Sequence, residues 1–272
     1  MPDMRIRRAA PADLPELTRL WQAAFGDPPE LIEQFYRRFP PTKAAWVVEA
    51  GGCVVTAAHL LEGRLHMADS GVLPCAYVYA VSTDPAHQGN GYASVLMHRF
   101  AMDADASGCV LYTLPAEASL YGWYQTVMGT TLTARGERMR IARQQAAGAL
   151  PNVTRISAPE YAALRAQLLQ GRVYAEPSAT LLDFQADLCA MSGGALVHVG
   201  SGCAVVERDG DTLIIKELLG ADTASAAQAL LAAFDAQTAQ VCLQKQDGTQ
   251  PLVAYRPFSR ADADAYWGLY LD

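Results

Sequence analysis

The stretch Val78-Tyr-Ala-Val-Ser-Thr-Asp-Pro-Ala-His-Gln-Gly-Asn-Gly-Tyr-Ala-Ser-Val-Leu-Met97 decides the fold of this chain. Its apolar first part predicts a strand that ends at Asp84-Pro85, and a short polar turn with Gly89 and Gly91 follows. A helix over residues 90–106 comes next. Glycines let a backbone approach an anion closely, and a helix start offers unpaired N–H groups and the positive end of the helix dipole. The order of strand, glycine turn and helix therefore favours a phosphate cradle.

Within this turn, Gln88-x-x-Gly91-x-Ala93 resembles the acyl-CoA-binding motif of the GNAT family of N-acetyltransferases. The turn has neither the Gly-Lys-Ser/Thr of a Walker A loop nor the full Gly-x-Gly-x-x-Gly of a dinucleotide-binding fold. A second segment, Leu114–Tyr124, resembles the part of the family that carries a general-acid tyrosine, although Met128-Gly129-Thr130 replaces the usual Gly-Phe. The resemblance covers residues 4–143 and is closest to bacterial acetyltransferases that join this domain to a second, degenerate copy.

The resemblance implies an enzyme, an acyl-CoA-dependent N-acyltransferase that moves an acetyl group from its cosubstrate acetyl-CoA to a primary amine by direct attack. In the family the central strand pairs with the pantetheine arm and donates a hydrogen bond to the thioester carbonyl, and the turn binds the pyrophosphate. The cofactor-binding residues that this implies here are Val81, Ser82, Thr83, Gln88, Gly89, Asn90, Gly91, Tyr92, Ala93 and Ser94. Neither a metal nor a covalent intermediate is expected.

Tyr124 is the expected general acid, and Tyr121, one helical turn earlier, is the alternative. A tyrosine has a pKa near 10, so its phenol is protonated at neutral pH and can donate to a departing thiolate. Aromatic residues three apart on a short helix also commonly pack in a core. The identity of the general base stays open among several residues near the expected cleft. Two of them lie on the central strand, where alternation predicts that Tyr77, Tyr79 and Val81 share one face. The candidates for the base are Glu117, Glu62, His66, Tyr77 and Tyr79.

Hydrophobic periodicity predicts a mixed α/β domain over residues 1–143, followed by a linker over 144–152. The order of its elements fits the GNAT fold that the resemblance implies. A second GNAT-like domain over 153–272 repeats the order strand, strand, strand, helix, strand. At its equivalent turn, Leu219–Ser225 lacks the Gln-x-x-Gly-x-Ala spacing, and Asp222 stands where a pyrophosphate would bind. The second domain is therefore not expected to bind CoA. The predicted elements are helices 12–25, 31–39, 90–106, 119–127, 159–170, 177–191 and 223–236, and strands 45–50, 53–61, 63–67, 75–82, 108–114, 131–143, 196–199, 203–209, 211–218 and 240–245.

The 272-residue chain is long enough for two domains, and half of its residues are hydrophobic. It has neither an apolar run long enough to cross a membrane nor a secretory signal pattern, so a cytoplasmic protein is expected. Six cysteines without a Cys-x-x-Cys pair indicate buried thiols. The last residues, Trp267–Asp272, are apolar almost to the end and are expected to pack as a strand.

Charge is uneven along the chain: residues 1–143 carry a net −1, residues 144–272 carry −6, and the whole carries −7. Without a basic patch, nucleic-acid binding is not expected. The acidic balance is compatible with a cationic amine substrate, and solubility alone also explains it. The identity of the acceptor amine stays open among aminoglycosides, polyamines, amino acids and protein or peptide amines. The oligomeric state also stays open, and a homo-oligomer is possible. The alternatives to an enzyme are a CoA-binding module without turnover and a protein whose second domain recruits a partner.

Overall fold

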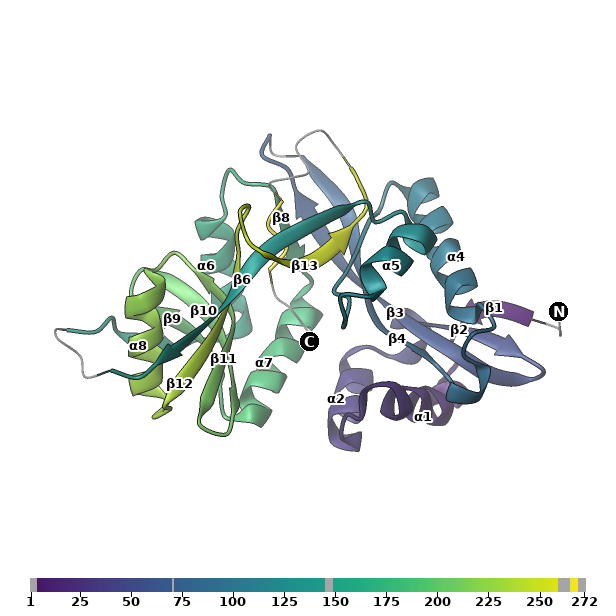
Figure 1. The fold of residues 1–272 in the computed structure, drawn as a ribbon, viewed down its shortest axis with the longest axis horizontal. Helices are drawn as coiled ribbons and strands as arrows, with labels where there is room; N and C mark the ends of the chain where they lie inside the picture. The colour runs from purple at the N-terminus through teal and green to yellow at the C-terminus, as the bar shows by residue number, and fades with distance from the viewer. Residues whose placement is uncertain (1–3, 70, 145–148, 259–264, 269–272) are drawn as a thin grey trace. The chain divides into compact units, whose positions relative to one another are not determined.

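The computed structural model describes residues 4–69, 71–144, 149–258 and 265–268, and these form two compact units (Figure 1). The first unit comprises Met1–Arg64, Leu73–Leu132 and Ala254–Phe258. The second comprises Leu65–Val72, Thr133–Val253 and Ser259–Asp272. The units are thus interleaved along the chain, whereas the expected domains, 1–143 and 153–272, follow its order. Those domain limits stay a prediction.

The first unit is a mixed sheet with helices on both faces. Its strands follow the order β1-β2-β3-β4-β5, and residues 254–255 of β13 pair with β5. Strands β4 and β5 are parallel, so the chain needs a crossover between them, and helix α4 supplies it. Its elements are β1 (Met4–Arg8), η1 (Pro11–Asp13), α1 (Leu14–Phe25), α2 (Pro29–Arg38), α3 (Pro41–Ala44), β2 (Ala45–Ala50), β3 (Cys53–His66), β4 (Val72–Thr83), η2 (Pro85–His87), α4 (Tyr92–Ser107), β5 (Val110–Thr113) and α5 (Leu120–Met128).

The two faces of this sheet are covered by different helices. Helices α4 and α5 bury Leu96, Met97 and Phe100, together with residues of α5, against strand residues such as Val78 (Figure 1). On the other face Trp21 of α1 packs its ring against that of Tyr79 in β4. Helix α1 forms because its apolar residues recur at helical spacing, and it ends where Gly26 adopts φ +71°.

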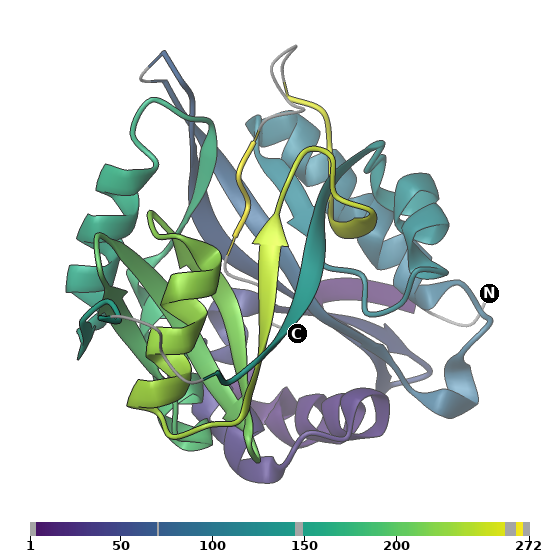
Figure 2. The ribbon, with the colours of Figure 1, turned by 60° about the vertical axis from the view of Figure 1, so that its left-hand side comes forward.

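The second unit repeats this arrangement with the strand order β6-β12-β11-β10-β9-β7. Strands β11 and β12 are parallel, and the crossover helix α8 lies in front of the strands in Figure 2. Helices α6 and α7 pack on other residues of β9 and β10. Its elements are β6 (Leu132–Ala142), β7 (Val153–Arg155), α6 (Ala158–Leu168), β8 (Tyr174–Pro177), α7 (Ala179–Ser192), β9 (Ala195–Val199), β10 (Gly202–Asp209), β11 (Thr212–Leu219), α8 (Thr223–Ala233), β12 (Thr238–Gln244) and β13 (Gln250–Tyr255).

Several predicted elements differ from the observed ones. The separate strands predicted over 53–61 and 63–67 are one strand, β3, because Gly63 continues the extended backbone rather than turning it. The pair Pro40-Pro41 ends α2 as expected, but Pro41 also begins the short helix α3, since proline suits a first helical position. Strands β1, β7, β8 and β13 were not predicted. Of the strand expected at the C-terminus, residues 269–272 lie outside the described residues.

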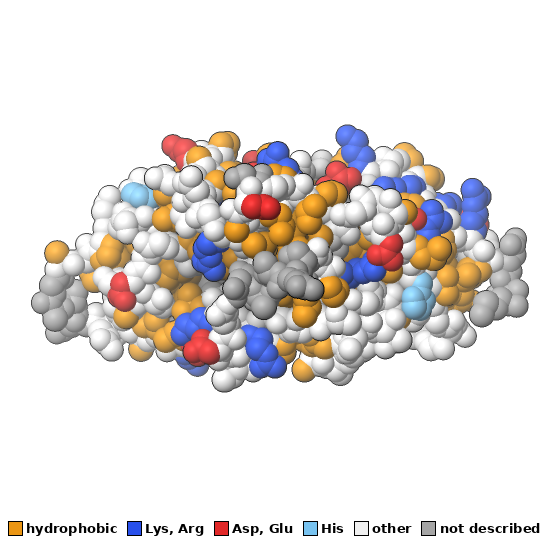
Figure 3. All heavy atoms as spheres, turned by 90° about the horizontal axis from the view of Figure 1, so that it is seen from above, with side chains coloured by type: hydrophobic (Ala, Val, Ile, Leu, Met, Phe, Trp, Pro, Cys, Tyr) orange, Lys and Arg blue, Asp and Glu red, His pale blue; other side chains and the backbone are white. Residues whose placement is uncertain are grey.

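The surface of the described residues carries mixed charge on the face seen in Figure 3, where basic and acidic side chains lie among each other. Of the helices in the described part of the chain, none has both the length and the hydrophobicity that a membrane span requires. The expectation of buried thiols holds for Cys75, Cys189 and Cys203, whereas Cys53 follows the Gly51-Gly52 turn and is exposed.

Candidate active site

A cavity of about 730 Å³ opens in the first unit where β4 ends and α4 begins. Its wall contains nine of the ten expected cofactor-binding residues, together with the end of α1 and part of α5. The tenth, Asn90, is not among the lining residues. The lining consists of Ala23, Ala24, Phe25, Val81, Ser82, Thr83, His87, Gln88, Gly89, Gly91, Tyr92, Ala93, Ser94, Ala116, Glu117, Leu120, Trp123 and Tyr124.

The start of α4 points unpaired backbone N–H groups at this cavity. Gly91 is its N-cap at φ +78°, and a glycine has no side chain that could cap the first turn. The helices of the second unit differ, because Ser157, Ser178 and Asp222 each cap a first turn with a side-chain oxygen. An uncapped N-terminus on a cavity wall has both the donors and the dipole that an anion needs.

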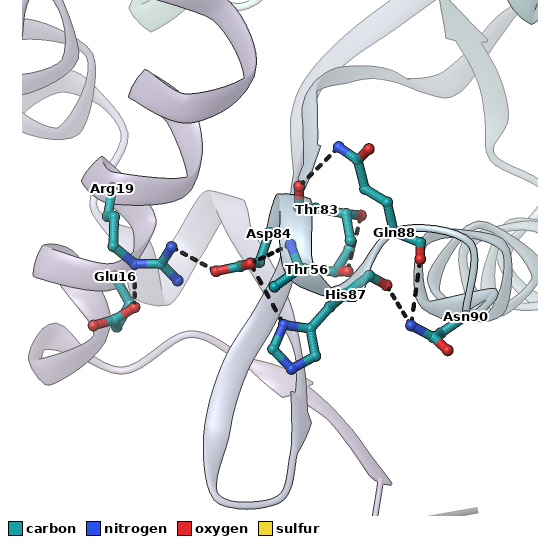
Figure 4. A network of polar contacts seen from close by, with 9 residues as sticks. Glu16, Arg19, Thr56, Thr83, Asp84, His87, Gln88 and Asn90 are labelled. Carbon is teal, nitrogen blue, oxygen red and sulfur yellow. Dashed lines mark hydrogen bonds and ion pairs between the residues drawn. The ribbon is translucent and has the colours of Figure 1, made fainter.

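The turn before α4 is fixed by polar contacts that Figure 4 shows together. The Asp84 carboxylate accepts a 2.8 Å hydrogen bond from the backbone N–H of Ala86. It also forms an ion pair with Arg19 of α1, with 2.6 Å between the guanidinium nitrogen and the carboxylate oxygen. The hydrogen bond from Ala86 has the larger effect and the contact with Arg19 the next, and together they hold the pKa of Asp84 below its usual range. His87 Nδ1 lies 3.5 Å from the same carboxylate. Asp84 therefore ties α1, one wall of the cavity, to the cradle turn.

Asn90 acts within the turn itself. Its side-chain amide donates to the backbone carbonyls of His87 at 3.0 Å and Gln88 at 3.3 Å (Figure 4). The Gln88 amide donates to the Thr83 carbonyl at 3.4 Å. Asn90 thus shapes the cradle turn from outside the cavity lining, and its direct contact with the cofactor stays a prediction.

Strand β4 has an open edge along the cavity. Its pairing with β5 ends at Val78 and Thr113, where the Thr113 hydroxyl donates to the Val78 carbonyl at 3.0 Å, but β4 continues to Thr83. A strand edge without its neighbour offers backbone donors and acceptors to an extended ligand. This is the edge at which the resemblance to the GNAT family places the pantetheine arm.

Ala80 interrupts the alternation of β4. It adopts φ +46°, in the left-handed region that costs a non-glycine residue about 1–3 kcal/mol. As a result Val81 packs in the same cluster as Val78, whereas Tyr79 packs on the opposite face against Trp21. The prediction that Tyr77, Tyr79 and Val81 share one face is therefore wrong for Val81. Strained residues of this kind gather at functional sites, and this one borders the cavity.

The two tyrosines proposed as the general acid lie differently. Tyr124 is 6% exposed and lines the cavity, whereas Tyr121 is half-buried and is not among the lining residues. Burial raises the pKa of Tyr124, and a hydrogen bond with Thr113 opposes this more weakly. Trp123, which the sequence reading did not single out, donates from its indole N–H to the Ser94 hydroxyl at 3.2 Å. It links α5 to the first turn of α4.

Of the candidates for the general base, Glu117 lies in the cavity wall, and its carboxylate accepts a hydrogen bond from Ser119 at 3.2 Å. Tyr77 stacks on Tyr112 with ring centroids 5.1 Å apart. His66 belongs to the second unit, where it pairs with Glu176 and stacks on Tyr174. Neither His66 nor Glu62 is among the lining residues. Within the described residues, His, Cys, Asp and Glu side chains form no group of three that could hold a metal ion.

The corresponding place in the second unit is filled by the chain itself. Strands β11 and β12 stay paired only to Ile215 and Val241. Beyond that point the Gln244 side chain bonds the backbone of Ala265 and Trp267, at 2.6 and 2.9 Å. Gly268 then packs so closely on the Glu217 carboxylate that a side chain there would collide with it. The segment 265–268 therefore occupies the space between the diverging strands.

His59, on β3, is a buried histidine that no sequence motif marked. Burial lowers its pKa to about 4, although hydrogen bonds to the backbone of Tyr79 and Ala80 oppose this. Between the ordinary pKa of 6.5 and about 4, the unfolded chain binds a proton that the folded protein excludes. Stability is therefore lost as the pH falls through this window, by about 1.4 kcal/mol per pH unit and roughly 3 kcal/mol in total.

We predict that His59→Asn removes this contribution. The free energy of unfolding of the variant should fall less between pH 7 and pH 4 than that of the wild type. Urea unfolding of both proteins at a series of pH values measures the difference. Parallel pH profiles for the two proteins would show that His59 is not held neutral by burial.

Comparison with known proteins agrees with this geometry. A sequence profile described as "Acetyltransferase (GNAT) domain" matches residues 5–126, which include the cradle and Tyr124. The chain contains a GNAT domain. No protein with a curated description matches the sequence.

Solved structures extend the GNAT comparison to both units at the level of the fold. A GCN5-related N-acetyltransferase from Kribbella flavida is 18% identical, with a TM-score of 0.65 over 93% of this chain and 70% of its own. One from Anabaena variabilis is 14% identical, with a TM-score of 0.69 over 94% and 71%. A tandem GNAT protein from the clavulanic acid biosynthesis pathway is 14% identical, with a TM-score of 0.55 over 93% and 97%. The predicted mixed α/β fold and its tandem GNAT character are confirmed.

Proposed function

We propose that this protein is an N-acetyltransferase that transfers an acetyl group from acetyl-CoA to a primary amine. One observation carries the proposal: a single cavity brings together the uncapped start of α4, the open edge of β4 and the buried phenol of Tyr124. These are a site for the pyrophosphate, a partner for the pantetheine arm and a proton donor. The GNAT domain over residues 5–126 supports the same reading.

The reaction needs few groups from the protein. The neutral amine nitrogen attacks the thioester carbonyl, the carbon–sulfur bond breaks, and the leaving thiolate takes the phenol proton of Tyr124. A backbone N–H near Val81 on the open edge of β4 is the expected donor to the carbonyl oxygen. The amine loses its proton to a base or to water, and Glu117 is the carboxylate that lines the cavity.

A panel of amines with detection of free thiol tests the proposal. The panel contains an aminoglycoside, a polyamine, free amino acids and a peptide with lysine and N-terminal amines. Release of CoA from acetyl-CoA that depends on one of these amines supports transfer. CoA binding without amine-dependent release from any of them would point instead to a CoA-binding module that has lost turnover.

Ionic strength should separate the two substrates. The chain carries a net charge of −7, so a cationic amine is concentrated near the protein at low salt. Salt screens this attraction, because the Debye length is about 10 Å at 0.1 M. We expect the KM of a cationic acceptor to rise several-fold between about 0.01 M and 0.5 M salt, and more than the KM of acetyl-CoA. Initial-rate kinetics would contradict this if both constants changed equally.

A further inference from the structure

The bend of β4 at Ala80 is held from the neighbouring strand by a side chain. His59 of β3 places its ring Nδ1 3.3 Å from the carbonyl oxygen of Tyr79, the residue before the bend. The other ring nitrogen, Nε2, lies 3.0 Å from the hydroxyl of Tyr36 in α2. One ring therefore connects helix α2 to the strained segment that borders the cavity.

The chemistry of the partners fixes the hydrogen positions in this chain of contacts. A carbonyl oxygen only accepts, so Nδ1 of His59 carries the hydrogen and donates it to Tyr79. Because a neutral imidazole has one N–H, Nε2 must accept, and the Tyr36 hydroxyl donates to it. Tyr36 thus donates a hydrogen bond to His59, and His59 donates one to the backbone of β4.

The surroundings leave the ring little freedom. His59 is 1% exposed, and its ring centroid lies 5.3 Å from that of Trp21 and 5.1 Å from that of Phe35. Both aromatic neighbours are themselves buried. A donor locked in this way can keep a neighbouring backbone in a left-handed conformation that an alanine would otherwise leave.

We propose that His59, oriented by Tyr36, is a positioning residue for acetyl transfer. By holding the Tyr79 carbonyl it fixes the backbone at Ala80 and Val81, and so the direction of the N–H groups on the edge of β4 that β5 leaves open. The inference rests on the proposed function, since it assigns these N–H groups to the thioester carbonyl. Donors to a developing oxyanion must be placed accurately, and a displacement of about 1 Å can cost on the order of 10² in rate.

Two amide substitutions make a matched pair. His59→Asn sets a donor near the position of Nδ1, and His59→Gln sets its amide near the position of Nε2 and withdraws the donor from Tyr79. Both remove the ring, so both lose its packing, and they differ in the contact to Tyr79. Each variant is measured for kcat with acetyl-CoA and an active amine, for the Kd of CoA, which lacks the acyl carbonyl, and for Tm.

We expect kcat to fall about 10- to 100-fold more in His59→Gln than in His59→Asn, with the Kd of CoA unchanged in both. A merely structural histidine would lower Tm in both variants and leave their kcat values alike. Equal kcat values, whether high or low, would therefore overturn the inference. A wild type without amine-dependent turnover would instead reject the proposed function, and this inference with it.

Tyr36→Phe provides a milder test if His59→Gln does not fold. It removes the hydroxyl that donates to Nε2, so the hydrogen is no longer directed to Nδ1 and the donor to Tyr79 is weakened. We expect kcat to fall about tenfold while the Kd of CoA stays the same. An unchanged kcat in Tyr36→Phe would show that the hydroxyl does not orient the ring for transfer.

Discussion

Replacing Tyr124 with Phe should lower kcat by a factor on the order of 10² to 10⁴, which is the usual cost of losing a general acid. The affinity for acetyl-CoA should change little, because the aromatic ring of Tyr124 stays in the cavity wall. Burial raises the pKa of this phenol, so the wild-type group is protonated throughout the neutral range and available as a donor. Steady-state kinetics with acetyl-CoA and an active amine measure the loss, and calorimetry measures the binding.

Tyr121→Phe is the matched control for this experiment. Tyr121 lies on the same helix, three residues earlier, but is not among the residues that line the cavity. We expect its variant to keep a kcat close to that of the wild type. A near-normal rate in Tyr124→Phe together with a large loss in Tyr121→Phe would move the role of the acid to Tyr121.

The second large effect is expected at the cradle, where Gly91→Glu should abolish CoA binding. Gly91 is the N-cap of α4, and a carboxylate there would take up the unpaired N–H groups and repel the pyrophosphate. Apart from its neighbours in the chain, no atom lies within 4 Å of the position of a Cβ at Gly91, so the first atom of the new side chain meets no obstacle. Calorimetric titration with CoA should show one site per wild-type chain and none in the variant.

Gly108→Glu controls for the strain of the substitution. Gly108 caps the opposite end of α4 at φ +67°, and its Cβ position is also open. The two variants therefore place a glutamate in the same left-handed backbone region at the two ends of one helix. Gly91→Glu lies in the cradle, and Gly108→Glu lies at the end of α4 away from it. CoA binding should survive in Gly108→Glu. Two CoA sites per chain, or unchanged affinity in Gly91→Glu, would refute a cradle restricted to the first unit.

Local sequence signals predicted the parts of the site that are contiguous in the chain. The strand, the glycine turn and the helix after Gly91 are encoded within about fifteen residues by alternation and by glycine. Tyr124 followed from the resemblance of its segment to the GNAT family, and the structure places it in the same cavity. The parallel crossover in each unit likewise follows from the order of strands and helices.

The parts that the sequence did not reveal depend on contacts between distant residues. Arg19 reaches Asp84 across 65 positions, and neither residue carries a signal for the other. The bend at Ala80 is invisible to strand alternation, because alanine has no preference for the left-handed region that His59 helps to hold. Strand β13 pairs with β5, more than a hundred residues earlier. Tertiary context decides all three.

The central claim is direct transfer of the acetyl group from acetyl-CoA to an amine, and following that group by mass spectrometry tests it most directly. Wild-type protein is incubated with isotopically labelled acetyl-CoA, with and without an active amine. We predict labelled acetyl-amine and free CoA in equal amounts, an intact protein mass that does not change, and no release of CoA when the amine is omitted. Label on the protein that is passed on to the amine, or CoA released without any acetylated amine, would contradict direct transfer.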